Sequence, residues 1–220
     1  RQDRWHGSFL CGPRHGDLYG KTLVIAGYGR IGREVARRAQ AFGMRIVAIN
    51  RSPRPGDPFC PDVRPMAALA DAAAEADFLL VTLPLDGQTR GIIDAPVLAA
   101  MKPTGVVMNV GRGPTIDEEA LYLALRERRI GGAIIDTWYA YPSQAEAAAA
   151  VHPPSRFPFR ELDNILMSPH ASAWTDALAG RRCAVIADNL DRLARGEPLR
   201  NVVAPARTGL SVPHRQRAPA

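Results

Sequence analysis

Three glycines at a fixed spacing near residue 30 could place backbone amides against a phosphate. Gly27-Tyr28-Gly29-Arg30-Ile31-Gly32 has the pattern GxGxxG, and it lies between an apolar run (21–27) and apolar residues at helical spacing. Glycine there permits a tight turn, close approach to a pyrophosphate and close strand–helix packing, while the helix N-terminus attracts the anion. We expect a dinucleotide site here. The alternative is a strand-to-helix turn without a ligand.

The residues after the second apolar run (45–50) could choose between NAD and NADP. An NAD site usually has Asp or Glu there, because a carboxylate accepts hydrogen bonds from the ribose 2′-hydroxyl. This chain has Asn50, Arg51 and Ser52 instead. An arginine and a serine can bind a 2′-phosphate through charge-assisted hydrogen bonds. We therefore expect NADP, with NAD possible; the alternative is that Arg51 is only a solvated loop residue.

The elements that must position these residues alternate regularly along the chain. Helical patterns stand at 31–42, 66–75, 95–101, 117–129 and 173–195, and a Pro-rich turn spans 52–65. Between them lie apolar runs of strand length, at 21–27, 45–50, 76–84, 105–111, 131–136 and 164–168. Strands that are apolar on both faces and separated by helices predict a parallel sheet covered on both sides. The expected fold is α/β, a doubly wound parallel sheet of the Rossmann type.

This pattern also predicts how the chain is organised. We expect an N-terminal arm or linker over 1–17, a dinucleotide-binding domain over 18–195, and a C-terminal segment over 196–220. The helix predicted over 173–195 ends the domain. Residues 204–220 contain several Pro and Arg and no apolar period, which predicts a disordered tail.

Composition argues against several classes of protein. The net charge of +6 comes from the ends, with five Arg against one Glu in 195–220 and four basic against two acidic residues in 1–21. A nucleic-acid domain would carry its basic residues on the folded body, so we expect no nucleic-acid partner. No apolar run is long enough for a membrane span. The three cysteines fit neither disulfide nor zinc spacing, so we expect no metal and a reducing cytoplasm.

Four stretches together resemble the D-isomer-specific 2-hydroxyacid dehydrogenase family. They are LYGKTLVIAGYGRIGREVARRAQAFGM (18–44), LPLDGQTRGIIDAPVLAAMKPTGVVMNVGRGPTIDEEALYLAL (83–125), GGAIIDTW (131–138) and NILMSPHASAWT (164–175). Their order and spacing cover most of residues 18–195. The resemblance implies hydride transfer between NADP(H) and a small 2-hydroxy acid or 2-oxoacid, as in glyoxylate or hydroxypyruvate reductases.

The resemblance also assigns roles to individual residues. Arg112 in NVGRG matches the substrate-binding arginine, whose fork suits a carboxylate, and His170 in SPH matches the proton donor. Asp136 matches the acid that binds the nicotinamide carboxamide; the alternative is a strand-end Asp that caps local amides. The residues expected to line the cofactor are Gly27, Gly29, Arg30, Ile31, Gly32, Asn50, Arg51, Ser52, Thr82, Leu83, Pro84, Val110, Gly111, Arg112, Asp136, His170 and Ser172.

The sequence departs from the family at the partner of the histidine. Family members have Glu where this chain has Tyr141, and that Glu pairs with the catalytic His. A neutral phenol can orient the imidazole but adds no charge that stabilises the imidazolium. We place Tyr141 among the catalytic residues on the hypothesis that it hydrogen-bonds His170; the alternative is that it only packs. We expect reduction to be fastest at mildly acidic pH, unless Glu146, Asp163 or Asp176 replaces the Glu or the pairing is unnecessary.

A second departure concerns the substrate-binding domain. The family carries one before the segment that matches residues 5–20, and this chain, which begins at Arg1, has none. We therefore expect a fragment or partial gene product that binds cofactor. Two further hypotheses remain open: a dinucleotide-sensing regulatory protein, similar to the corepressors of the family, and an inactive product. The resemblance also implies a homodimer, with 5–19 and the helix near 117–128 as candidate contacts.

Overall fold

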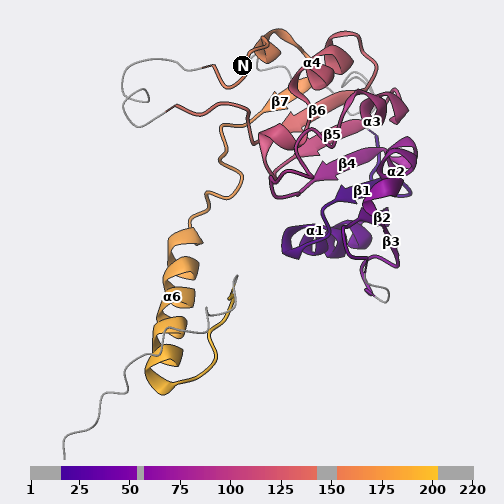
Figure 1. The fold of residues 1–220 in the computed structure, drawn as a ribbon. Helices are drawn as coiled ribbons and strands as arrows, with labels where there is room; N and C mark the ends of the chain where they lie inside the picture. The colour runs from indigo at the N-terminus through magenta and orange to yellow at the C-terminus, as the bar shows by residue number, and fades with distance from the viewer. Residues whose placement is uncertain (1–15, 54–56, 143–152, 203–220) are drawn as a thin grey trace, which may run out of the picture. The chain divides into compact units, whose positions relative to one another are not determined.

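The fold is taken from a computed structural model, which describes residues 16–53, 57–142 and 153–202 (Figure 1). The chain divides into two compact units, one that ends at Ser172 and one that begins at Ala173. The predicted tail (204–220), most of the predicted arm (1–17) and Glu146 lie outside the described residues.

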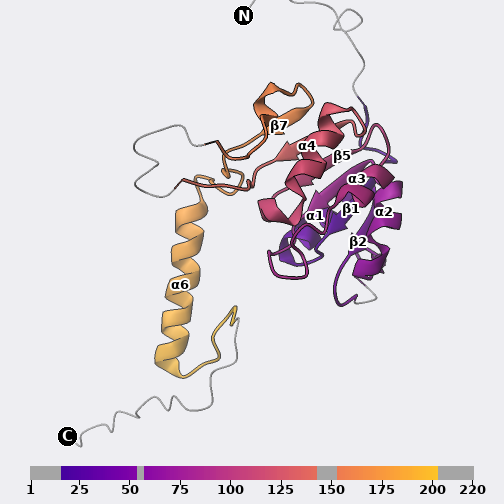
Figure 2. The same ribbon diagram turned by 45° about the horizontal axis from the view of Figure 1, so that its top comes forward.

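The first unit is built on one seven-stranded sheet, in which every neighbouring pair of strands is parallel. The strand order is β3-β2-β1-β4-β5-β6-β7, so the chain winds outward from β1 in both directions (Figure 1). In the turned view of Figure 2, β2 and β5 lie on opposite sides of β1. This order confirms the predicted doubly wound fold. The strands are β1 (Thr22–Ala26), β2 (Arg45–Ile49), β3 (Asp62–Arg64), β4 (Phe78–Val81), β5 (Val106–Asn109), β6 (Gly132–Ile135) and β7 (Ile165–Met167).

The strand β3 corrects the sequence analysis, which predicted only a Pro-rich turn over 52–65. Its three residues pair with β2 in the register Val47↔Asp62. A strand this short, between Pro61 and Pro65 and with two charged ends, has neither the length nor the apolar pattern that marks a strand in sequence. It is the edge of the sheet, where proline flanks are tolerated.

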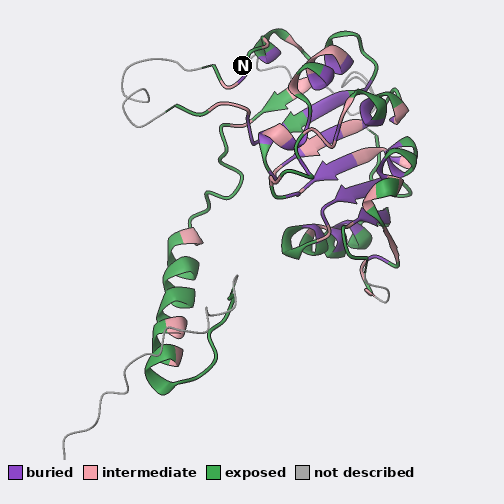
Figure 3. Ribbon diagram, in the orientation of Figure 1, coloured by how far each residue is buried: buried purple, intermediate pink, exposed green. Residues whose placement is uncertain are grey.

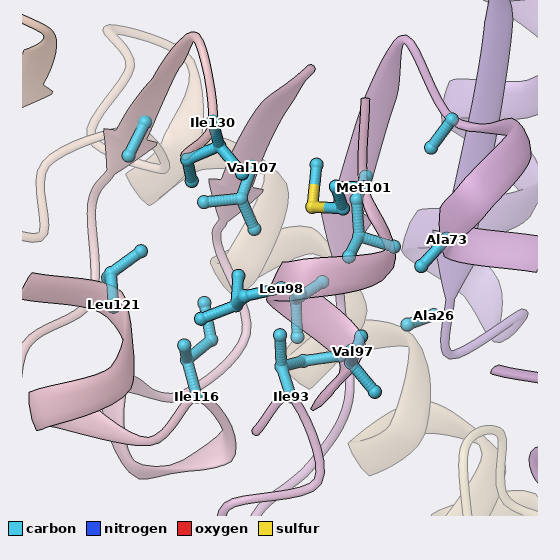
Figure 4. Packing of buried hydrophobic residues seen from close by; sticks show 14 of the residues in the cluster. Ala26, Ala73, Ile93, Val97, Leu98, Met101, Val107, Ile116, Leu121 and Ile130 are labelled. Atoms are coloured by element: carbon cyan, nitrogen blue, oxygen red, sulfur yellow. The ribbon is translucent and has the colours of Figure 1, made fainter. Parts of the chain in front are cut away.

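Helices cover both faces of the sheet, as predicted. They are α1 (Arg30–Ala41), α2 (Leu69–Glu75), α3 (Ala95–Ala100) and α4 (Glu118–Arg126), with short 3₁₀ helices η2 (Met66–Ala68), η3 (Gly113–Thr115) and η4 (Phe159–Glu161). The larger core cluster joins α2, α3 and α4 to one face, and the smaller joins α1 to the other. Figure 4 shows Val97 and Leu98 of α3 gathered with Val107 and Ile116 in the larger cluster.

Burial is uneven across the sheet (Figure 3). The strands β1, β2 and β4 are almost entirely buried, because a core cluster lies on each of their faces. Toward the other edge, Ile134 of β6 and Leu166 of β7 are 39% and 60% exposed. The centre of the sheet is therefore its most deeply buried part, and the dinucleotide pattern stands directly after β1.

The second unit contains α6 (Leu178–Arg195), which ends at Gly196 with a left-handed φ of 70°. This helix, predicted to start near residue 173, starts five residues later, after a turn closed by the hydrogen bond from Leu178 N to Thr175 O. Three apolar residues of the predicted stripe, Ile186, Leu190 and Leu193, are exposed. Among the described residues, no helix is long and apolar enough to cross a membrane.

Candidate functional site

The predicted site residues follow the carboxyl ends of parallel strands, which meet at one edge of the sheet. At the point where the winding reverses, between β1 and β4, there is a cleft of about 600 Å³. Ligands of doubly wound sheets bind at this topological position. The cleft is lined by Gly27, Gly29, Asn50, Arg51, Ser52, Met66, Thr82, Leu83, Pro84, Asp86, Gln88, Thr89 and Ile92.

The three glycines of the GxGxxG turn differ in their surroundings. Gly27 has a φ of 100°, and a Cβ there would lie 2.9 Å from the Leu83 backbone nitrogen. A Cβ at Gly32 would lie 2.7 Å from the Gly27 carbonyl oxygen, whereas a Cβ at Gly29 would meet nothing within 4 Å. Gly27 and Gly32 are therefore required by the fold. Gly29 faces open space, as a residue next to a bound pyrophosphate must.

The glycine turn is held by Thr82, which follows β4, and it leads into α1, a helix without a side-chain cap. The Thr82 hydroxyl donates to the Gly27 carbonyl oxygen at 2.5 Å. Gly29 is the N-cap of α1 and supplies no side-chain cap, and the first turn contains no acidic residue. The positive dipole end of the helix thus meets an anion with no acidic side chain of its first turn to repel it. Arg30 and Ile31 form this first turn, and Ile31 is 57% exposed.

The segment after β2 presents an arginine that is already paired. The Asn50 side chain accepts from Arg51 N at 3.1 Å and donates to the Ser52 carbonyl at 3.3 Å, which shapes the turn. The Arg51 guanidinium lies 2.6 Å from the Asp86 carboxylate. The sequence analysis did not identify Asp86, because the two residues are 35 positions apart.

The turn after β5 carries Arg112 on its surface. Buried Asn109 accepts from Gly111 N at 2.9 Å and donates to the Arg112 carbonyl at 3.1 Å, so its amide closes the turn. Gly111 packs against Leu83, where a Cβ would lie 2.7 Å from the carbonyl oxygen. The exposed Arg112 guanidinium donates only to the Gly111 carbonyl, at 2.7 Å, among the bonds of the described residues. An exposed guanidinium here can bind a carboxylate.

Asp136, which ends β6, binds the loop that carries His170. Its side chain is buried and accepts from the hydroxyls of Ser168 and Ser172 at 2.7 and 2.5 Å. It also accepts from the backbone N–H groups of Ala171 and Ser172, at 2.9 and 3.2 Å. Burial raises the pKa of Asp136, but these hydrogen bonds outweigh burial and hold the pKa below its usual value. The geometry is that of the local-capping alternative, and the contact with a nicotinamide carboxamide stays a prediction.

His170 lies at the tip of this loop. It is exposed and has a φ of 58°, which is left-handed and uncommon for a residue other than glycine. The Tyr141 ring lies 5.5 Å from the imidazole, centroid to centroid, with 47° between the planes. The Tyr141 hydroxyl, however, accepts from Trp138 N at 2.8 Å, so its observed partner is the backbone and not His170.

Of the other acids considered for His170, Asp163 precedes β7 and pairs with Arg128 at 2.6 Å, so the strand separates it from His170. Asp176 belongs to the second unit, where its carboxylate accepts from Ala177 N at 2.7 Å. Trp138 is buried and donates its indole N–H to the Ser168 carbonyl at 2.8 Å, and Tyr139 packs against the larger core cluster. Both aromatics therefore pack at this end of the sheet. Burial, with Glu118 and Asp117 nearby, raises the pKa of Tyr139.

The structure thus gathers the predicted residues into two groups along one sheet edge. The first group lines the cleft and consists of Gly27, Gly29, Asn50, Arg51, Ser52, Thr82, Leu83 and Pro84. Arg30, Ile31 and Gly32 belong to the first turn of α1 and are not part of this lining. Tyr141, Asp136 and His170 stand after β6 and β7. The Arg112 turn joins the second group, because a Cβ at Gly113 would lie 2.2 Å from the Trp138 carbonyl oxygen. Sequence reasoning missed Asp86, Asn109 and Ser168. The signal for Asn109 and Ser168 was their place at strand ends, next to residues already singled out.

Comparison with known proteins gives a family. Residues 1–172 match the family model described as the NAD-binding domain of D-isomer specific 2-hydroxyacid dehydrogenases. A D-3-phosphoglycerate dehydrogenase of Methanocaldococcus jannaschii is 34% identical over 194 residues, which are 85% of this chain and 34% of the relative. A glyoxylate reductase of Thermococcus onnurineus is 34% identical over 199 residues, 88% of this chain and 53% of the relative. The chain therefore spans about a third to a half of these relatives.

Solved structures agree with the sequence comparison. An NADPH-dependent glyoxylate/hydroxypyruvate reductase from Sinorhizobium meliloti, in complex with NADP and sulfate, superposes with a TM-score of 0.74 at 27% identity. The match covers 87% of this chain and 58% of that one. The resemblance stated from sequence is thereby confirmed.

Proposed function

Because the chain belongs to the D-isomer specific 2-hydroxyacid dehydrogenase family, we propose that the protein is an oxidoreductase that transfers a hydride between a nicotinamide cofactor and a small 2-hydroxy acid or 2-oxoacid. The observation that carries this proposal is the placement of Arg112 and His170. Both side chains are exposed and stand at the carboxyl ends of β5 and β7, on the sheet edge that also holds the cleft. A protein that only sensed dinucleotides would have no chemical need of this pair.

The cleft fits a dinucleotide on physical grounds. Gly29 leaves room for a pyrophosphate, and α1 begins with its positive dipole end and no acidic residue in its first turn. Arg51 and Ser52 line the end of the cleft after β2, where no acidic residue stands in sequence. We propose NADP(H) as the preferred cofactor, bound through a 2′-phosphate at Arg51 and Ser52, with NAD(H) also accepted. Similar structures in complex with NADP support this choice.

The chain's own residues then divide the chemistry. Bound dihydronicotinamide would supply the hydride. Arg112 would bind the substrate carboxylate through two parallel hydrogen bonds and polarise the neighbouring carbonyl. His170 would donate a proton to the carbonyl oxygen during reduction and accept it back in the reverse direction. Asp136 would hold the His170 loop in place, since its carboxylate binds that loop at four donors.

The substrate class follows from the same pair. An arginine that takes a carboxylate next to a proton donor selects an acid whose carbonyl is adjacent to the carboxylate. Relatives named glyoxylate reductase and glyoxylate/hydroxypyruvate reductase support small 2-oxoacids. We propose glyoxylate and hydroxypyruvate as the first substrates to test.

The test measures NADPH oxidation by the intact protein with glyoxylate, hydroxypyruvate and pyruvate. We expect turnover with at least one of them, and a loss of at least about a hundredfold in kcat/KM for Arg112→Ala, because the carboxylate loses its fork. Asp163→Asn is the control, since it removes a charge at the other end of β7, before the strand begins. Tight NADPH binding without oxidation of any of the three acids would contradict the proposal.

That outcome would favour a second candidate, a dinucleotide-sensing regulatory protein. The observation in its favour is that Tyr141 stands where the family has an acid, and that the Tyr141 hydroxyl accepts a hydrogen bond from Trp138 N. An inactive family member would show neither turnover nor dinucleotide binding. The three candidates therefore separate in one pair of measurements.

We also propose an assembly and a compartment. Resemblance to the family supports a homodimer, which light scattering of the purified protein tests directly. Cys60 and Cys183 are free thiols, which supports a reducing compartment such as the cytoplasm. Burial raises the pKa of Cys60 to about 11, so this thiol is inert and packs in the core.

A further inference from the structure

We propose that Asp86 determines how strongly the cleft prefers NADP over NAD, by competing with the 2′-phosphate for the Arg51 guanidinium. This inference rests on the proposed function, because it assumes that the cleft binds the adenosine half of the cofactor beside Arg51. It adds a residue that sequence patterns do not assign. Asp86 follows β4, whereas the residues that usually discriminate between the cofactors follow β2.

The pair stands across the cleft. Arg51 comes from the loop after β2 and Asp86 from the loop after β4, both residues line the cleft, and the guanidinium and carboxylate approach to 2.6 Å. Their side chains are 59% and 39% exposed. The guanidinium expected to bind a 2′-phosphate is thus already paired with an anion that belongs to the protein.

The Asp86 carboxylate is fixed by its own loop. Its Oδ1 accepts from the N–H groups of Gln88 and Thr89, at 2.9 and 3.0 Å. The Thr89 hydroxyl in turn accepts from Asp86 N at 2.8 Å and donates to the Pro84 carbonyl at 2.7 Å, and Thr89 is buried. One carboxylate oxygen therefore shapes the loop, and the other, Oδ2, faces Arg51. The carboxylate cannot easily swing away when a phosphate arrives.

Opposite consequences follow for the two cofactors. A 2′-phosphate must displace Asp86 from Arg51 and then remain near a carboxylate that repels it. A 2′-hydroxyl meets no such repulsion and can donate a hydrogen bond to Oδ2, as it does to the acid of an ordinary NAD site. Because an exposed ion pair is weak, the carboxylate reduces the preference for NADP without abolishing it. This arrangement would let one cleft accept both cofactors.

The variant Asp86→Asn separates the two roles of the carboxylate, which are to shape the loop and to pair with Arg51. The amide oxygen of asparagine can still accept from Gln88 and Thr89, so the loop keeps its shape, while the charge facing Arg51 is removed. We would measure equilibrium binding of NADPH and NADH to the intact protein by nicotinamide fluorescence. The variants are Asp86→Asn, Arg51→Ala and the double variant, with Glu119→Gln on the exposed start of α4 as the control for loss of one negative charge.

We expect Asp86→Asn to tighten NADPH binding about five- to tenfold and to leave NADH binding unchanged or weaker. Arg51→Ala should weaken NADPH binding, and in that background Asp86→Asn should gain less, because the competition no longer exists. An unchanged NADPH to NADH ratio in Asp86→Asn, or the same gain with and without Arg51, would overturn the inference. If the parent protein bound neither cofactor, the proposed function itself would fail.

Discussion

Trp138 donates its backbone N–H to the Tyr141 hydroxyl at 2.8 Å, within one turn of the chain after β6. This bond uses a lone pair of the hydroxyl and leaves the Tyr141 ring beside the His170 imidazole. Tyr141 thus limits where the imidazole can lie, while it brings no negative charge to it. The catalytic role of Tyr141 stays a prediction, and the two variants below test it.

Replacing Tyr141 by Phe should weaken the turn without changing the charge near His170. Loss of one partly buried hydrogen bond costs about 0.5–1.5 kcal/mol in the free energy of unfolding. The pH–rate profile for reduction should keep its shape, since no titrating group changes. Urea denaturation and initial rates measure the two effects, and a shifted profile would show that the hydroxyl acts on His170 directly.

Replacing Tyr141 by Glu should move the pH optimum for reduction upward. A carboxylate beside the imidazole stabilises the imidazolium, so the proton donor stays charged to a higher pH. The half-exposed position of Tyr141 limits the shift to about one pH unit. Initial rates of reduction at saturating NADPH, from about pH 5 to 9, measure it. Profiles that coincide for the variant and the parent would place Tyr141 in packing alone.

The glycine turn gives a prediction that separates folding from binding. Gly29→Ala should leave the melting temperature almost unchanged, because its Cβ meets nothing within 4 Å, but should weaken dinucleotide binding by occupying the space for the pyrophosphate. Gly32→Ala should lower the free energy of unfolding by about 1–3 kcal/mol, because its Cβ approaches the Gly27 carbonyl. Thermal melts and NADPH titrations of both variants measure this contrast. Tight binding by Gly29→Ala would place the pyrophosphate elsewhere.

Asp136 should limit local opening of the loop that carries His170. In Asp136→Asn, the loss of a charged acceptor weakens the bonds from Ala171 and Ser172, so these two amides should exchange with deuterium at least about tenfold faster. Asp163→Asn, which breaks an exposed ion pair before β7, is the matched control and should leave these amides unaffected. Equal exchange in all three proteins would mean that other contacts hold the loop.

The pKa of Glu75 gives the protein a specific acid sensitivity. Hydrogen bonds from Arg64 and Arg45 lower this pKa to about 2. A depressed pKa contributes stability that is present above the unfolded value, about 4.3, and is lost as the pH falls toward 2. Glu75→Gln should therefore cost about 0.5–1 kcal/mol near pH 7, a figure already reduced for solvent screening, and less near pH 3. We would measure the urea midpoints of the parent, of Glu75→Gln and of the control Glu119→Gln at both pH values. A difference between the parent and Glu75→Gln that is as large at pH 3 as at pH 7 would contradict this prediction.

Local sequence patterns were enough for the parts of the fold that depend on neighbouring residues. The GxGxxG turn has its expected context because strand, glycines and helix are contiguous in the chain. The apolar runs at 76–84 and 105–111 are longer than the strands β4 and β5 within them. Their last residues, such as Leu83 and Gly111, leave the sheet and pack against each other beside the cleft.

The rest depends on pairs that are far apart in sequence. No local pattern connects Arg51 with Asp86, or Asp136 with Ser172, because 35 and 36 positions separate them. The short strand β3 is stabilised by pairing with β2 and by the ion pairs of Arg64 with Asp62 and Glu75, which sequence periodicity does not record. The helix α6 begins late because the first turn of its predicted range forms a bend closed by Thr175.

The charged edge strand β3 has a consequence for how copies of the protein meet in solution. An unpaired edge offers free N–H and C=O groups to a strand of another molecule, and long apolar edges aggregate in this way. Here the edge is three residues long, begins and ends with a charge, and is bounded by Pro61 and Pro65. A second sheet would find almost no ladder to extend. Self-association through this edge is thereby disfavoured, so the cleft beside β2 is not covered by a second sheet joined there.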